Sequence, residues 1–111
     1  MAPSKLTLAG YMTDWLKDYA EAHLRTRTVQ GYTGVVKRYN IPEVGSVLLS
    51  ELRPSRIETF YGDLQRQGLS PATNKQTHVI LKSALNRAVR LGLLSVNPCT
   101  AVNAPEGSIH N

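Results

Sequence analysis

Apolar residues recur every three or four positions along four stretches of the chain, which is the spacing of one face of an α-helix. The first predicted helix spans residues 8–23 and follows Thr7, a residue type that caps helix starts. Because Trp15 and Tyr19 lie within its apolar stripe, we expect both rings in the core. The whole stripe is Leu8, Tyr11, Met12, Trp15, Leu16, Tyr19 and Ala20.

The second predicted helix spans residues 28–39 and carries two internal glycines, Gly31 and Gly34. Each glycine lowers helix propensity by roughly 1 kcal/mol relative to alanine. Such glycines mark either a loosely formed helix or a place where another backbone or a ligand comes close. Pro42 and Gly45 predict the end of this helix, so residues 40–51 are expected to form a loop with one short extended piece at 47–49.

The third and fourth predicted helices span residues 54–67 and 71–91. Pro54 suits a first helical position, Gly68 a helix stop and Ser70 the cap of the next helix. Gly92 ends the fourth pattern. One side of that helix is apolar, and the other carries a row formed by Lys75, His78, Lys82 and Asn86.

Four amphipathic helices with short links must bury their stripes together, which predicts a small all-α four-helix bundle. The length of 111 residues and the 41% hydrophobic content fit one domain with a packed core. Residues 97–111 are rich in proline, glycine, asparagine and serine, and are expected to form a linker or a frayed end.

Composition excludes several classes of protein. The longest apolar run is three residues, as at residues 47–49, which excludes a transmembrane helix and a signal peptide. Cys99 is the single cysteine, so an internal disulfide and a multi-cysteine zinc site are excluded. We therefore expect a reducing, cytoplasmic compartment and no contact with membranes.

The chain has 13 basic and 8 acidic residues, for a net charge of +5, and this charge is unevenly distributed. Residues 1–23 hold two basic and three acidic residues, whereas residues 24–111 hold eleven basic and five acidic ones. A positive field after the first helix favours a polyanionic partner, of which nucleic acid is the commonest. The alternative is a solvated surface with a mild basic bias.

Motifs for catalysis are missing from the sequence. The histidines, His23, His78 and His110, are not paired at metal-ligand spacing, and no glycine-rich phosphate loop occurs. Cys99 has no neighbouring activating motif and is expected to be a structural or free thiol. These absences favour a binding module without metal or cofactor over an enzyme.

The second and fourth predicted helices carry the residue types that DNA binding requires. Lysine and arginine neutralise phosphates, free N–H groups at helix starts and hydroxyls bind phosphate oxygens, and glutamine and asparagine reach base edges. The candidate contacts are Arg27, Gln30, Thr33, Gly34, Lys37 and Arg38 on the second helix, and Ser70, Thr73, Asn74, Lys75, His78 and Lys82 on the fourth.

Several short pieces, in order, resemble the core-binding domain of phage integrases in the tyrosine recombinase family. They are LAGYMTDWL at 8–16, TVQGY at 28–32, IPEVG at 41–45, LRPSRIETFYGDL at 52–64, GLSPAT at 68–73, LKSALNRAV at 81–89 and LSVNP at 94–98, with Ala104-Pro105 after them. No single piece is diagnostic, but together they cover residues 6–105.

The resemblance implies a SAM-like four-helix bundle whose second and fourth helices face double-stranded DNA. It implies that this domain, residues 1–105, grips one side of the core recombination site while a separate catalytic domain grips the other, with residues 106–111 leading toward it. The family's His-x-x-Arg motif and tyrosine nucleophile are not matched, since His78 is followed three residues later by Leu81. The chain is therefore expected to have no strand-cleaving activity, to be monomeric alone, and to meet other recombinase protomers on nucleoid DNA.

A protein-interaction bundle is the alternative function. The acidic first helix, with Asp14, Asp18 and Glu21, could meet a neighbouring protomer or an accessory factor. This interpretation predicts self-association without DNA, and it does not exclude DNA binding by the other helices.

Overall fold

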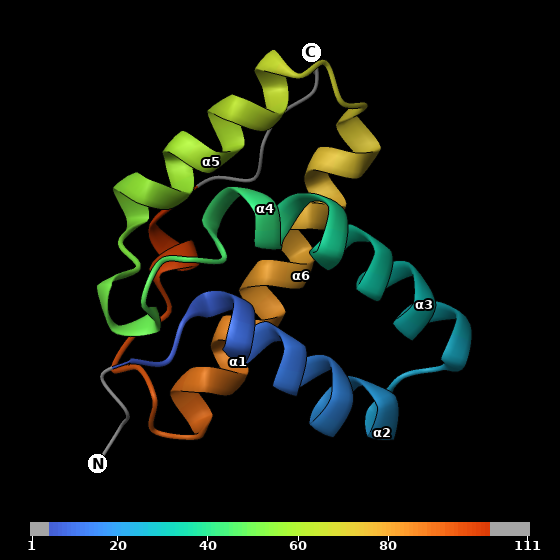
Figure 1. The fold of residues 1–111 in the computed structure, drawn as a ribbon, viewed down its shortest axis with the longest axis vertical. Coiled ribbons are helices and arrows are strands. Elements are labelled where there is room, and N and C mark those ends of the chain that lie inside the picture. Colours follow the sequence, from blue (N-terminus) through green and yellow to red (C-terminus); the bar gives the residue numbers. More distant parts are fainter. Residues whose placement is uncertain (1–4, 103–111) are drawn as a thin grey trace. The chain divides into compact units, whose positions relative to one another are not determined.

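The computed structural model describes residues 5–102, and helices account for most of this part of the chain (Figure 1). The chain divides into two compact units, Met1–Glu51 and Leu52–Asn111. Within the described residues each unit contains two continuous helical segments, so the predicted all-α fold with four helices is confirmed.

The first helical segment of the N-terminal unit follows the prediction closely. It consists of α1 (Leu8–Trp15), a π-helical stretch (Leu16–Ala20) and α2 (Glu21–His23). Thr7 caps it, since its hydroxyl oxygen accepts a hydrogen bond of 3.1 Å from the Gly10 N–H. Trp15 is only 3% exposed, as expected of a core residue, whereas Tyr19 is half-buried.

The second helical segment is longer than predicted. It consists of α3 (Thr26–Val35), a π-helical stretch (Val36–Asn40) and α4 (Ile41–Val44). The prediction of a loop from residue 40 is therefore wrong as far as residue 44. Proline breaks an α-helix because it lacks an N–H and its ring clashes with the carbonyl four residues earlier. Here the wider π-helical turn, in which the Ile41 N–H bonds to the Val36 carbonyl, places Pro42 in a new first turn where it is tolerated.

The predicted extended piece at residues 47–49 is present as a single antiparallel bridge between Thr7 and Leu48. The Leu8 N–H bonds to the Val47 carbonyl at 2.8 Å, and the Leu49 N–H bonds to the Leu6 carbonyl at 2.8 Å. A short 3₁₀ turn, Leu49–Glu51, follows. The bridge ties the end of this unit to the start of α1.

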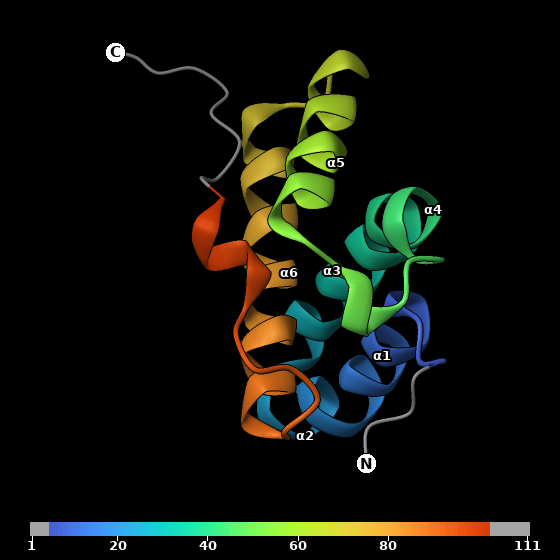
Figure 2. The ribbon, with the colours of Figure 1, turned by 90° about the vertical axis from the view of Figure 1, so that its left-hand side faces the viewer.

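The two helices of the C-terminal unit are α5 (Pro54–Arg66) and α6 (Pro71–Arg90), joined by a short connection (Figures 1 and 2). Gly68 has φ +78°, a conformation that favours glycine, and Ser70 caps α6 by accepting a hydrogen bond of 3.2 Å from the Thr73 N–H. Gly92, with φ +80°, follows the end of α6. The predicted starts of both helices and their start and stop signals are confirmed, and each helix ends one residue earlier than predicted.

The segment after α6 differs from the expected frayed end. Pro98–Ala101 form a 3₁₀ turn, and Cys99 and Val102 are 1% and 7% exposed. Asn97 holds this turn in place, because its Nδ2 donates to the Lys82 carbonyl at 3.0 Å and its Oδ1 accepts from the Cys99 N–H at 2.8 Å. The structure is therefore folded onto α6 as far as residue 102, the last described residue, and the predicted linker at 106–111 lies outside the described residues.

Candidate nucleic-acid interface

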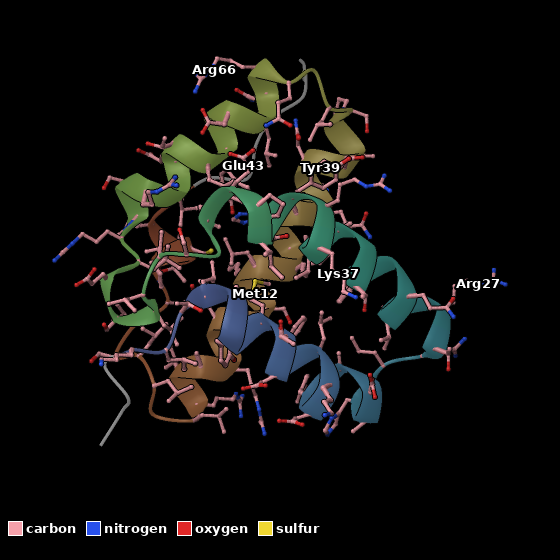
Figure 3. The ribbon with its side chains drawn as sticks, in the orientation of Figure 1. Met12, Arg27, Lys37, Tyr39, Glu43 and Arg66 are labelled. Atoms are coloured by element: carbon pink, nitrogen blue, oxygen red, sulfur yellow. The ribbon has the colours of Figure 1, made fainter. Side chains whose placement is uncertain are left out.

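The first candidate face lies on α3 and the π-helical stretch that continues it. Arg27, Gln30 and Gly34 share one side of α3, at spacings of three and four residues, and all are exposed. Lys37 and Arg38 are exposed on the π-helical stretch, and Figure 3 shows Arg27 and Lys37 projecting from this one helical segment.

The start of α3 adds backbone donors to this face. Arg25 occupies the cap position, and its side chain makes no capping hydrogen bond. The first N–H groups of a helix have no partner within it, and the helix dipole makes this end favourable for anions. None of the α3 residues is buried, so the helix presents these donors beside Arg27. Thr33, the remaining predicted contact here, is half-buried at the edge of the face.

The second candidate face lies on α6, where the structure supports only part of the prediction. Ser70, Lys75 and Lys82 are exposed, and the hydroxyl of half-buried Thr73 accepts a bond of 3.0 Å from the Ser70 hydroxyl. Asn74 and His78, in contrast, are 2% and 8% exposed. Their predicted surface positions are wrong, because both side chains point to the buried side of the helix.

The buried position of His78 has a clear physical cause. The Tyr61 hydroxyl, on α5, lies 2.6 Å from His78 Nδ1, and the two rings meet edge to face at 5.4 Å. Burial, and then the nearby charge of Lys82, lower the pKa of His78, so its neutral form is favoured. His78 is thus a hydrogen-bonded core residue.

Cys99 completes this buried cluster. Its thiol interacts with the Tyr61 hydroxyl, and burial raises the pKa of Cys99 to about 12. Burial also raises the pKa of Tyr61 well above its usual range. Both groups are therefore neutral at physiological pH, and the expectation of a structural thiol fits this burial.

The exposed row of α6 differs from the predicted row at one position, where Val79 takes the place of His78. Lys75, Val79, Lys82 and Asn86 lie along it, and exposed Gln76 lies beside Val79. Sequence reasoning missed Gln76 and Val79 because it placed polar His78 in the exposed row of this helix and considered neither of the other two residues for that row. The available signal was the centre of the apolar stripe at Leu81, Ala84 and Ala88, which lies opposite Val79.

Residues 5–102 lack two further structural features. No helix there has the length and apolar character needed to cross a membrane. No group of three or more histidine, cysteine, aspartate or glutamate side chains in that range could hold a metal ion.

A family model and a related protein of known name both point to the same protein family. Residues 7–65 match the family model described as "Phage integrase, N-terminal SAM-like domain". An integrase from Saccharopolyspora erythraea is 31% identical over 101 residues, which are 89% of this chain and 23% of that protein. The chain thus spans about a quarter of the length of this relative.

Solved structures give the same result. The phage integrase SAM-like domain from Moorella thermoacetica is 36% identical, with a TM-score of 0.79, over 100% of this chain and 95% of that one. A lambda integrase dimer bound to a COC′ core site shares the fold at 18% identity, with a TM-score of 0.81 over 94% of this chain and 37% of that one.

Proposed function

This chain belongs to the family of phage integrase N-terminal SAM-like domains, and on that basis we propose that it binds duplex DNA through α3 and α6. The proposed contacts are the exposed members of the two faces. They are Arg27, Gln30, Gly34, Lys37 and Arg38 in the N-terminal unit and Ser70, Lys75 and Lys82 in the C-terminal unit, with half-buried Thr33 and Thr73 at the edges.

The single observation that carries this proposal is the exposure of five cationic side chains on these faces: Arg27, Lys37, Arg38, Lys75 and Lys82. Phosphate contacts by lysine and arginine supply most of the affinity for duplex DNA and release condensed counterions. Phosphate contacts position a protein on DNA, whereas side chains such as Gln30 can hydrogen-bond to base edges.

More specifically, we propose that the chain is one half of a clamp that closes around DNA. It grips one side of the core recombination site, and a catalytic domain elsewhere in a longer integrase grips the other side and cleaves the strand. The lambda integrase structure on its core site supports this arrangement. The chain itself then binds DNA without cutting it.

The test is a fluorescence anisotropy titration of a labelled duplex over a range of salt concentrations. Neutralising about four phosphates predicts a slope near −3.6 in a plot of log affinity against log salt. Affinity is expected to be modest because, in this proposal, half of the DNA contacts come from the catalytic domain. A slope near zero would contradict the proposal.

A second candidate function is docking of another protein on the N-terminal unit. A groove of about 330 Å³ lies at the turn between α2 and α3, lined by Glu21, Leu24, Thr26, Val29 and Gln30. Exposed Asp14 and Asp18 lie on the same helical segment as Glu21, so this region suits a basic, partly apolar segment of a protomer or accessory factor. Concentration-dependent sedimentation without DNA tests for a second copy as the partner.

A further inference from the structure

Val79 is an apolar side chain on an otherwise polar, cationic helix face. It is 44% exposed, which sets it apart from the buried aliphatic residues that follow it, Ile80 and Leu81. The buried side of α6 is complete without it, since Leu81, Ala84 and Ala88 are all 0% exposed there. The packing of this chain's core therefore does not explain why residue 79 is apolar.

The position of Val79 on the face is central. With about 100° of rotation per residue, Lys75 and Lys82 lie about 40° and 60° to one side of Val79, and Gln76 and Ser83 lie about 60° and 40° to the other. Lys75, Gln76 and Lys82 are exposed, and Ser83 is half-exposed. Val79 thus occupies the middle of the surface that α6 offers to DNA in the function proposed above.

The chemistry of base edges identifies what an exposed valine can contact there. The major groove of duplex DNA admits an α-helix, and its one apolar feature is the C5-methyl group of thymine. Flanking cations bind phosphates on the walls of the groove, whereas residues along the middle of the inserted helix reach the base edges. A branched aliphatic side chain has no hydrogen-bonding group for the other bases.

We propose that Val79 is a specificity-determining residue that packs against a thymine methyl group in the major groove, between the phosphate contacts of Lys75 and Lys82. This inference rests on the proposed DNA-binding function. It adds one property to that function: preference for thymine at one position of the site. Gln76, which lies beside Val79, has the amide that suits an adjacent adenine.

The experiment uses DNA that differs only by this methyl group. Duplexes bound by the chain are first selected from a random pool. Each thymine of the selected sequence is then replaced in turn by deoxyuridine, which lacks the C5-methyl group, and affinity is measured by anisotropy. One replacement is expected to weaken binding about fourfold, the effect of removing one buried methyl group.

The variant Val79→Ala links this loss to the side chain. It should bind the thymine duplex at least about fourfold more weakly, because it loses the methyl group in contact with thymine. It should also be insensitive to deoxyuridine at the same position, so the two changes are not additive. Val96→Ala is the matched control, because Val96 is 70% exposed and lies beyond the end of α6. It should retain the full deoxyuridine effect. Circular dichroism confirms that both variants are folded.

The outcomes separate this inference from the function on which it rests. If the chain binds DNA with the expected salt slope and no thymine replacement matters, or if Val79→Ala keeps the deoxyuridine effect, the role of Val79 is refuted while DNA binding stands. If the parent chain shows no salt-dependent binding, the proposed function fails and this inference fails with it. If Val79→Ala changes self-association in sedimentation and leaves DNA affinity unchanged, Val79 contacts protein instead.

Discussion

The Tyr61 hydroxyl and Nδ1 of His78 lie 2.6 Å apart, and this bond joins α5 to the buried side of α6. Residues 78 and 79 are separated by about 100° around a helix. Holding His78 inward therefore directs Val79, with Lys75 and Lys82, to the exposed side. A core hydrogen bond of this kind determines which residues α6 can offer to a partner.

Lowering the pH should destabilise the protein through His78. Burial and Lys82 lower the pKa of His78 in the folded state, whereas its pKa in the unfolded chain is about 6.5. Below that pH the unfolded state binds more protons, so the free energy of unfolding falls as pH decreases and levels off below the folded pKa. Thermal unfolding between pH 8 and 5 measures this loss.

The variant His78→Gln should flatten this dependence of stability on pH, while the exposed control His23→Gln should not. Parallel pH profiles for the parent and both variants would refute the role of His78.

Detaching the segment after α6 should expose the buried thiol. Cys99 is 1% exposed with a raised pKa, so its reaction with a thiol reagent at pH 8 should be slow in the folded protein. Asn97→Ala removes the bonds to the Lys82 carbonyl and the Asn86 side chain, and we expect it to speed this reaction at least several-fold. Exposed Ser95→Ala is the control. Equal rates for Asn97→Ala and the parent would show that Asn97 does not hold the segment.

Two glycines should respond in opposite ways to alanine. A Cβ at Gly45 would lie 2.5 Å from the Ile41 carbonyl oxygen, so Gly45→Ala should lower the melting temperature. Gly34 has no atom within 4 Å of that position, so Gly34→Ala should stabilise the helix by about 0.5–1 kcal/mol. If DNA approaches α3 closely, the same Gly34→Ala protein should bind DNA more weakly despite its greater stability. Unchanged DNA affinity would remove Gly34 from the interface.

Removing charge from α6 should weaken DNA binding for all sequences. We expect Lys75→Ala/Lys82→Ala to reduce affinity broadly and to lower the magnitude of the salt slope by about 2, because two phosphate contacts are lost. Changes at Arg27 or Gln30 should instead alter sequence preference. Lys5→Ala/Lys17→Ala, which removes two exposed lysines outside both faces, is the charge-matched control. Binding by the α6 double variant equal to that of the parent would contradict the account of α6.

Much of the fold could be predicted because local signals agree with the packing. Thr7, Pro54, Gly68 and Ser70 act on neighbouring backbone groups, and each does in the structure what its chemistry predicts. Pro42 misled the prediction because a π-helical turn places it in the first turn of α4, where no N–H is needed. Such a turn has no simple sequence signature. Asn97 misled it because its hydrogen bonds reach Lys82 and Asn86, which are far away along the chain.

The candidate site was harder to predict than the fold. On α3, the polar residues could be predicted to be accessible from their polarity alone, because no residue of that helix is fully buried. On α6, polar Asn74 and His78 are buried while apolar Val79 is exposed, so polarity and exposure disagree at these positions. His78 is buried because it has a hydrogen-bond partner on another helix, Tyr61. Single-sequence periodicity does not reveal such a partner.

The most direct test of DNA binding is an NMR titration of isotope-labelled protein with a short duplex at two salt concentrations. DNA binding through α3 and α6 should produce chemical-shift changes clustered at residues 27–38 and 70–82, strongest for the exposed side chains and fading at high salt. Changes confined to residues 8–23, or none at low salt, would contradict it and favour the protein-docking function.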